Sequence, residues 1–311
     1  MSRVTWMSNL SLVIGDKPLN KIIIPGTHDS HSYAIDLNNC LGDFKIRLAS
    51  KLGRKLPCVR KMITDWTLTQ DRSVLSQLIM GVRYFDFRVS YSERCQRYYM
   101  SHSFACVYLE DVLAQIRTFV VNNTGEIVIF TITPDWENRI TMTHERNNEV
   151  INTVIDHFTS LLIRVSPQIS TYNKLISEGT RVMFFYNSWD IDIFPEVWLM
   201  SSLYSPWDNT SNMEVKKEMI SRDMERLSGN KINNISLVLT PQKSDIKKDI
   251  FLRIVNPFHK ANSVLVMSNK INSYLDEFID RYWDQMGQIW ISFDFPTTQM
   301  IDKVIKLNFY N

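Results

Sequence analysis

Short apolar runs alternate along the chain with longer segments in which apolar residues recur every three or four positions. The short runs predict buried strands, and the longer segments predict helices that bury one face. The predicted strands are 21–24, 83–88, 126–131, 181–186, 237–240 and 288–293, with a further short strand near 98–100. The predicted helices are 71–80, 109–121, 147–162, 213–227, 269–286 and 298–307.

This alternation predicts an α/β fold. Several of the strands are apolar on both faces, which is typical of parallel strands covered by helices. Six or seven strands in 311 residues fit an irregular (β/α) barrel, and a doubly wound open sheet is the alternative. The chain has neither a G-x-G-x-x-G motif nor a Walker A motif, which disfavours nucleotide-binding open sheets. Since no linker or repeat divides it, we expect one domain over residues 1–311.

Composition excludes several classes of protein. Hydrophobic residues make up 44% and charged residues 22%, the balance of a packed protein. The formal net charge of +2 argues against nucleic-acid binding. None of the 4 cysteines forms a C-x-x-C pair, so a zinc ribbon is not expected. The chain shows neither a signal peptide nor an apolar run long enough to span a bilayer, and we expect a cytoplasmic protein.

Titratable residues stand at the ends of several predicted strands. The functional residues of a (β/α) barrel gather at the carboxyl ends of its strands, so these side chains are expected to share one pocket. Burying such groups is costly unless they pair or act in chemistry. The candidate catalytic residues are His28, Asp29, Asp86, Arg88, His102 and Asp294.

This set suits the cleavage of a phosphodiester by an internal hydroxyl group. The reaction needs a base for the attacking hydroxyl, an acid for the leaving oxygen and a cation for the phosphorane. Two histidines can supply the base and the acid, and a carboxylate can hold the tautomer of each. Arg88 can clamp phosphate. An interior ion pair between Asp86 and Arg88, two positions apart on one strand, is the alternative for those two residues.

Five blocks in order carry a resemblance to a known family. They are 6–30, which contains Pro-Gly-Thr-His-Asp-Ser, 66–88, 205–210 with Pro-Trp-Asp-Asn-Thr, 239–241, and 294–308. The chain resembles the phosphatidylinositol-specific phospholipase C (PI-PLC) X-domain-containing proteins, the small ones that lack PH, EF-hand, Y and C2 modules. The resemblance extends over almost the whole sequence.

The resemblance implies a distorted TIM barrel that cleaves phosphatidylinositol lipids to diacylglycerol and a cyclic inositol phosphate. It implies that His28 is the general base, supported by Asp294. It also implies that His102 is the general acid, supported by Asp29. We therefore expect phosphoinositide lipids as substrates and an enzyme that visits membranes as a peripheral protein.

The resemblance also bears on metal use. It implies that Arg88 binds the phosphate and that Asp86 holds Arg88 or the pocket in place. Calcium-dependent relatives have acidic ligands on the second strand and an asparagine after the first histidine, where this chain has Arg88 and Asp29. A guanidinium cannot ligate calcium. The pattern resembles the bacterial, metal-independent arrangement, and we expect neither a metal nor another cofactor.

Two departures leave the headgroup open. Many relatives have His-Gly at the acid, where this chain has His102-Ser103. The bacterial enzymes carry a lysine after the strand that matches 126–131, and this chain has none in 131–135. The candidate headgroup contacts are Tyr186, Asn187 and Asn209, with core packing or turn formation as the alternative.

Residues 44–63 suit an anionic membrane surface. The segment contains no acidic residue, and apolar residues alternate with its basic ones. Its basic residues are Lys45, Arg47, Lys51, Arg54, Lys55, Arg60 and Lys61. A solvated loop or helix face is the alternative. Three tryptophans near strand ends could also enter the interface or pack in the core, namely Trp136, Trp189 and Trp207.

Two other functions compete with phospholipase activity. One is a barrel that binds phosphoinositides with little turnover, which Ser103 and the missing lysine would suit. The other is a metal-dependent barrel of the glycerophosphodiesterase or sphingomyelinase D kind. Such enzymes hold magnesium with acidic ligands after the first histidine, and Arg88 counts against that arrangement.

Overall fold

The computed structural model describes residues 2–38, 41, 44–135, 141–165, 170–256 and 261–310. Eight parallel strands form a nearly closed barrel in the order β7-β6-β5-β2-β1-β10-β9-β8. They are β1 (Ile24–Thr27), β2 (Tyr84–Ser92), β5 (Val128–Pro134), β6 (Val182–Tyr186), β7 (Trp198–Leu199), β8 (Leu203–Tyr204), β9 (Ile232–Leu237) and β10 (Trp290–Phe293). The predicted α/β barrel is confirmed.

The barrel is irregular where its two edges meet. The short strands β7 and β8 are joined by the 3₁₀ turn η4 (Met200–Ser202), without the helix that connects most parallel neighbours. A hairpin of β3 (Arg97–His102) and β4 (Phe104–Tyr108) pairs with the second half of β2 and is not part of the barrel order. This hairpin carries His102 to the carboxyl end of the barrel.

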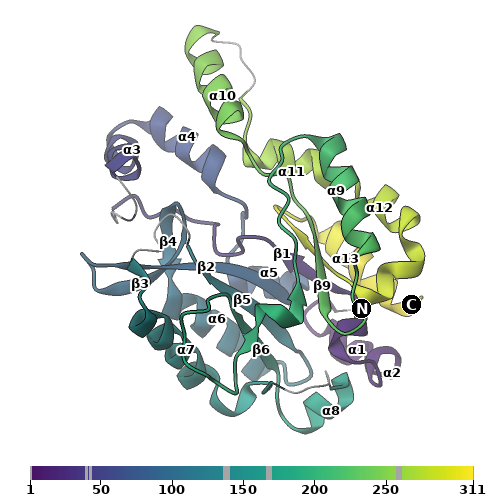
Figure 1. Ribbon diagram of the computed structural model, residues 1–311. Coiled ribbons are helices and arrows are strands. Elements are labelled where there is room, and N and C mark those ends of the chain that lie inside the picture. The colour runs from purple at the N-terminus through teal and green to yellow at the C-terminus, as the bar shows by residue number, and fades with distance from the viewer. Residues whose placement is uncertain are drawn as a thin grey trace.

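Helices cover the outside of the barrel (Figure 1). They are α5 (Val74–Met80), α6 (Leu109–Asn122), α7 (His144–Phe158), α8 (Tyr172–Ser177), α9 (Met213–Glu225), α11 (Val264–Asn272), α12 (Leu275–Arg281) and α13 (Thr298–Lys306). The short helices α1 (Trp6–Asn9) and α2 (Ser11–Ile14) precede β1. Further 3₁₀ turns are η1 (Leu19–Lys21), η3 (Thr159–Leu161), η5 (Trp283–Gln288) and η6 (Leu307–Phe309).

Three helices stand apart from this layer. They are α3 (Phe44–Lys55), α4 (Pro57–Thr67) and α10 (Lys243–Val255). Figure 1 shows all three at one end of the molecule, with α10 extending beyond the rest. No helix of the described chain is long and apolar enough to cross a bilayer.

A buried ion pair lies where α1 meets the barrel. Arg83 and Glu126 have fully buried side chains, and Nη2 of Arg83 lies 2.7 Å from Oε2 of Glu126. Glu126 also accepts hydrogen bonds from the backbone N–H groups of Met7 and Ser8. The pair therefore fixes the N-terminal segment to the starts of β2 and β5.

The predicted elements agree best where a strand is wholly apolar. The prediction 181–186 coincides with β6, and the short strand near 98–100 is β3. The prediction 237–240 is wrong, because the strand is β9 at Ile232–Leu237 and the following residues line a pocket. The polar residues Asn234 and Ser236 interrupt the apolar pattern of β9, so the sequence does not indicate this strand clearly. They lie inside the barrel, where Asn234 accepts a hydrogen bond from Ser292 Oγ at 2.7 Å.

Candidate active site

A pocket of about 670 Å³ lies at the carboxyl ends of the barrel strands. The loops after β1, β9 and β10 line it together with β2 and the β3–β4 hairpin. All six residues predicted to be catalytic line this one pocket, namely His28, Asp29, Asp86, Arg88, His102 and Asp294. The predicted convergence of strand ends is therefore present in the structure.

The loop after β1 places His28 and Asp29 by backbone contacts. Gln70 Nε2 donates to the carbonyl of His28 at 2.8 Å and to that of Phe293 at 3.1 Å, joining the ends of the first and last strands. Thr69 Oγ1 donates to the carbonyl of Asp29 at 2.9 Å. Asp29 itself has φ of 38°, a left-handed conformation that costs energy in a residue with a side chain.

Asp29 contacts or faces three basic side chains of the pocket, namely Arg88, His28 and His102. Its Oδ1 lies 2.6 Å from Nε of Arg88. Its Oδ2 lies 3.4 Å from Nε2 of His28 and 3.5 Å from Nε2 of His102. Burial by itself would raise the pKa of Asp29, but Arg88 and His28 hold that pKa well below its usual range. The same contact with Asp29 raises the pKa of Arg88.

His28 lies between two carboxylates. Its Nδ1 lies 3.0 Å from Oδ1 of Asp294, the contact that the resemblance implies. Burial by itself would lower the pKa of His28, but Asp29 and Asp294 outweigh it and raise that pKa to about 9. Burial raises the pKa of Asp294, although the neighbouring imidazole opposes this. With this pKa, His28 carries a proton on each ring nitrogen at neutral pH.

His102 is held differently from the expectation. Its Nδ1 donates to the backbone carbonyl of Thr67 at 2.8 Å, so a carbonyl rather than a carboxylate fixes its tautomer. Nε2 then faces the pocket and Asp29. The next residue, Ser103, has φ of 59°, a conformation that favours glycine.

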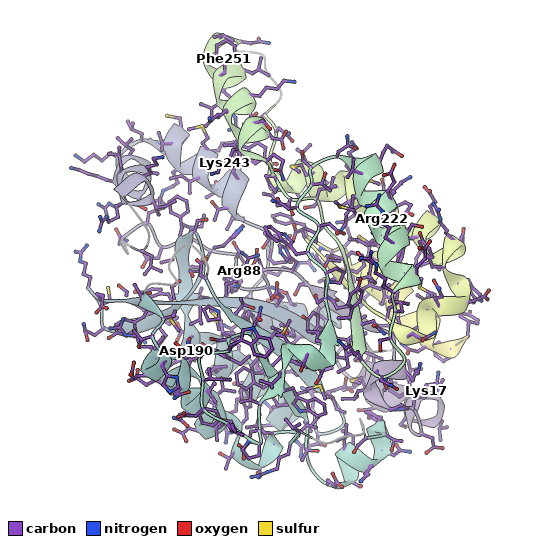
Figure 2. The ribbon with its side chains drawn as sticks, viewed as in Figure 1. Lys17, Arg88, Asp190, Arg222, Lys243 and Phe251 are labelled. Atoms are coloured by element: carbon purple, nitrogen blue, oxygen red, sulfur yellow. The ribbon has the colours of Figure 1, made fainter. Side chains whose placement is uncertain are left out.

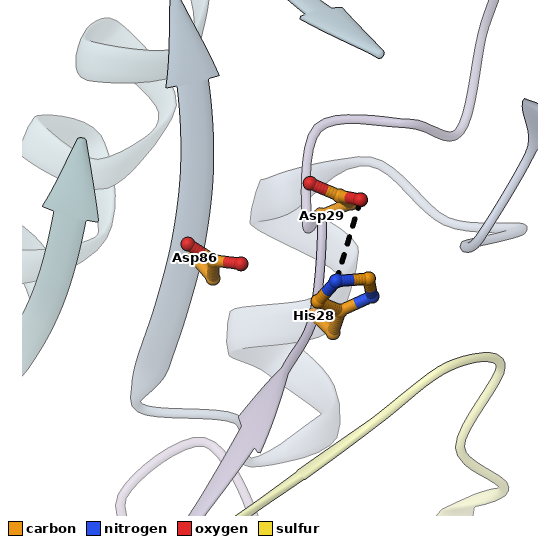
Figure 3. A group of neighbouring side chains, drawn as sticks. All are labelled: His28, Asp29 and Asp86. Carbon is orange, nitrogen blue, oxygen red and sulfur yellow. Dashed lines mark ion pairs between the residues drawn. The ribbon is translucent and has the colours of Figure 1, made fainter. Parts of the chain in front are cut away.

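The resemblance implies that Asp86 holds either Arg88 or the pocket in place, and Asp86 lines the pocket. The ion pair of Arg88 is with Asp29, and Asp86 lies beside the loop after β1 (Figure 3). Burial, and then the charge of Asp29, raise the pKa of Asp86. His28, Asp29 and Asp86 each offer a possible metal ligand, and these atoms lie within 4.8 Å of one another. Arg88 competes for the Asp29 carboxylate of this trio.

The three candidate headgroup contacts divide into two groups. Asn187 and Asn209 line the pocket. Tyr186 is buried, does not appear among the described lining residues, and donates to Oδ1 of Asn147 at 2.8 Å. This places the Tyr186 side chain in the packed interior between β6 and α7.

Sequence reasoning missed a buried ion pair on the pocket wall. Lys216 of α9 lines the pocket with only 2% of its side chain exposed, and its Nζ lies 2.8 Å from Oδ2 of Asp208. Burial lowers the pKa of Lys216, although Asp208 opposes this. The segment 213–227 is predicted as a helix, and its many charged residues give no sign that Lys216 is buried. The block 205–210 contains Asp208 and was the available signal.

A third histidine is buried next to the site. His31 is fully buried, and its Nε2 donates to the carbonyl of Ser101 at 2.9 Å. Burial lowers the pKa of His31 to about 3, so this imidazole is neutral. Ser101 Oγ donates to the carboxylate of Asp135, another pocket residue, at 2.8 Å.

Barrel and pocket together define a PI-PLC-like α/β barrel. The phosphatidylinositol-specific phospholipase C from Listeria monocytogenes superposes with a TM-score of 0.69 at 18% identity, covering 99% of both chains. A variant of the Staphylococcus aureus phosphatidylinositol-specific phospholipase C gives a TM-score of 0.67 at 19% identity, covering 99% of this chain and 98% of that one. These similarities establish the fold.

Curated sequences identify the relatives. The human PI-PLC X domain-containing protein 2 is 26% identical over 273 residues, which is 86% of each chain. The zebrafish (Danio rerio) PI-PLC X domain-containing protein 3 is 25% identical over 252 residues, covering 79% of this chain and 76% of its own length. No family model matches the chain. The homologues of this chain are therefore PI-PLC X domain-containing proteins, and the predicted resemblance is confirmed.

Proposed function

We propose that the protein is a phosphodiesterase of the PI-PLC type that cleaves phosphatidylinositol lipids to diacylglycerol and cyclic inositol phosphate. One observation carries the proposal: a single buried carboxylate, Asp29, contacts Arg88 and faces Nε2 of both His28 and His102. A base, an acid and a phosphate-binding cation are thereby assembled around one position.

The two histidines divide the proton transfers. His28 first releases the Nε2 proton to solvent, and this nitrogen then takes the proton of the inositol 2-hydroxyl as its oxygen attacks phosphorus. Asp294 keeps the other proton on Nδ1 and stabilises the imidazolium that forms. His102, with its Nδ1 proton held by Thr67, donates from Nε2 to the oxygen of the departing diacylglycerol.

Arg88 supplies the charge that stabilises the transition state. Its guanidinium, fixed by Asp29, offers donors to the phosphate oxygens as negative charge develops there. We propose that the reaction needs no metal, because this guanidinium already occupies the carboxylate that a cation would require. The trio of His28, Asp29 and Asp86 is the observation that favours a metal-dependent alternative.

The headgroup lies on the opposite pocket wall in this proposal. Asn187 and Asn209 contact ring hydroxyl groups, and the Lys216–Asp208 ion pair offers both a donor and an acceptor to them. The lysine that the sequence lacks after β5 is thus provided from α9. Binding with little turnover is the competing function, favoured by the side chain that Ser103 adds to the pocket lining next to His102.

Helices α3 and α4 bring the enzyme to a membrane in this proposal. Leu48, Leu52 and Leu56 recur at four-residue spacing and are 44%, 40% and 45% exposed. The basic residues of 44–63 surround them, which suits an anionic bilayer. Trp189 and Trp207 are also exposed, and Trp136 lies outside the described residues. Membrane binding is described for the Staphylococcus aureus phospholipase.

The test is hydrolysis of phosphatidylinositol vesicles with and without EDTA. We expect diacylglycerol and cyclic inositol phosphate in both conditions, and no product from His28→Ala or His102→Ala. His157→Ala on α7 is the matched control, because His157 does not line the pocket. Product that disappears with EDTA would support the metal-dependent alternative. Vesicle binding without product would support the binding protein.

A further inference from the structure

Helix α10 lies between two parts of the chain that both line the rim of the pocket. Residues 238–241 line the pocket, and α10 starts at Lys243. The chain returns to the pocket at Val264, the first residue of α11. A helix of 13 residues is about 20 Å long, so whatever surface α10 meets also lies close to the pocket mouth.

One face of α10 is anchored to the body of the protein. Asp249 is buried and accepts hydrogen bonds from Trp66 Nε1 at 3.1 Å and from Arg253 Nε at 2.7 Å. Arg253 also contacts Asp65 at 2.8 Å. Because Asp65 and Trp66 belong to α4, these contacts attach α10 to the helix pair that carries the basic residues of 44–63. The position of α10 is therefore fixed, and a second face remains outside.

The outer face of α10 combines apolar and basic side chains. Phe251 is 61% exposed and Val255 is 55% exposed. They continue a four-residue spacing that starts with the exposed Lys243 and Lys247, and exposed Lys248 lies beside them. Figure 2 shows Lys243 at the end of α10 nearer the barrel and Phe251 toward the outer end. An exposed aromatic residue among lysines is typical of segments that lie in a bilayer interface.

We propose that α10 is a membrane anchor that inserts Phe251 and Val255 into an anionic lipid surface while its lysines contact the lipid phosphates. Charge complementarity selects this occupant, because α10 adjoins a segment with basic residues and no acidic ones. The anchor rests on the proposed function, since it brings the pocket mouth to the surface that holds the substrate. It is separate from α3 and can be tested without disturbing it.

Vesicle sedimentation tests the anchor. With phosphatidylcholine vesicles containing phosphatidylserine, we expect Phe251→Ala to weaken binding at least about tenfold. The double change Lys247→Gln with Lys248→Gln should weaken it about 30-fold. Phe309→Ala is the matched control, because Phe309 is 52% exposed and belongs to η6, apart from α10. Binding equal to that of the unchanged protein in both α10 variants would overturn the proposal.

An environment-sensitive fluorophore locates the insertion directly. Phe251→Cys is labelled in a background of Cys40→Ser, Cys58→Ser and Cys95→Ser, and Phe309→Cys is labelled in the same background as the control. We expect a blue shift and a gain of emission on vesicles for the label at 251 and none for the label at 309. A label at 251 whose emission does not change while the protein sediments with vesicles would overturn the proposal. A blue shift of this label without vesicles, caused by self-association, would also overturn it.

A monomeric short-chain phosphatidylinositol separates this inference from the proposed function. Below its micelle concentration, the substrate requires the pocket and no membrane. We expect the Phe251→Ala variant to hydrolyse it at the rate of the unchanged protein while losing activity on vesicles. If the unchanged protein fails on the monomeric substrate, the proposed function fails, and the fluorophore experiment still decides whether α10 inserts.

Discussion

The guanidinium of Arg88 lies against the carboxylate of Asp29, with Nε 2.6 Å from Oδ1. Asp29 is fully buried, so its charge depends on this partner. Asp29 follows β1 and Arg88 lies within β2, and these two strands are neighbours in the barrel. The contact therefore fixes a cation at the place where two histidines meet the same carboxylate.

Replacing Arg88 separates its charge from its geometry. Lysine keeps the positive charge beside Asp29 but loses the planar fork that matches phosphate. We expect Arg88→Lys to lower kcat/KM by roughly 10²–10³ while the free energy of unfolding changes little. Kinetics on a monomeric substrate and urea denaturation check the two parts. An Arg88→Lys variant with full activity would remove Arg88 from the proposed phosphate site.

The pKa of His28, about 9, is expected to set one limb of the pH profile of the proposed reaction. A base must be neutral, and kcat/KM reports ionisation in the free enzyme. We therefore expect the ionisation of His28 to contribute a limb of kcat/KM that rises about tenfold per pH unit towards pH 9, opposed by the falling limb that loss of the His102 proton contributes. Asp294→Asn removes one of the carboxylates that raise this pKa, so the rising limb should move to lower pH. A limb that stays in place in Asp294→Asn would contradict the assignment of His28 as base.

The headgroup wall can be tested by comparing a pocket residue with a buried neighbour. Asn187 lines the pocket, whereas Tyr186 beside it is buried and bonded to Asn147. We expect Asn187→Ala to raise KM several-fold, about the effect of one hydrogen bond, with kcat little changed. Tyr186→Phe should leave KM unchanged and destabilise the fold by about 1 kcal/mol. A raised KM in Tyr186→Phe with an unchanged KM in Asn187→Ala would instead assign Tyr186 to headgroup binding.

The sequence predicted the residues of the site better than their contacts. His28, Asp29 and Asp294 follow strongly apolar runs, so both their strand-end positions and their convergence could be inferred. That Asp29 faces both imidazoles depends on the distance between β1 and the β3–β4 hairpin, which no local pattern encodes. The carbonyl of Thr67 that holds His102 is a backbone group and leaves no signature in the sequence.

The fold could be predicted where burial follows a simple period. Strand β6 is apolar at every position, and the prediction located it. Strand β9 has polar residues that lie inside the barrel, and the prediction placed this strand too far along the chain. Lys216 is buried by its neighbours in space, although its own helix is mostly charged. Helix α10 was also missed, since its apolar residues do not form one clear face and tertiary contacts through Asp249 hold it in place.

Ser103 carries a conformation that glycine adopts without cost. Its φ of 59° costs a residue with a side chain about 1–2 kcal/mol, a cost that glycine avoids. The flexibility that glycine adds to the unfolded chain offsets about 0.4–1 kcal/mol of this gain. We expect Ser103→Gly to stabilise the fold by up to about 1 kcal/mol and to retain or raise kcat/KM, because the pocket widens. Ser103→Ala keeps Cβ and should do neither. Thermal unfolding and kinetics of both variants check this, and a less active Ser103→Gly would show that the hydroxyl group takes part in the site.

The Arg83–Glu126 pair is expected to contribute to stability and not to catalysis. Both side chains are fully buried, so Glu126→Gln leaves the Arg83 charge unpaired and should cost about 3–5 kcal/mol of unfolding free energy. Neither residue lines the pocket, and kcat/KM measured well below the unfolding transition should stay unchanged. Asp302→Asn is the control: it breaks the exposed pair with Arg3, where 44% and 35% of the two side chains are accessible, and should cost under about 1 kcal/mol. Equal losses in the two variants, measured by urea denaturation, would show that burial does not set the strength of these pairs.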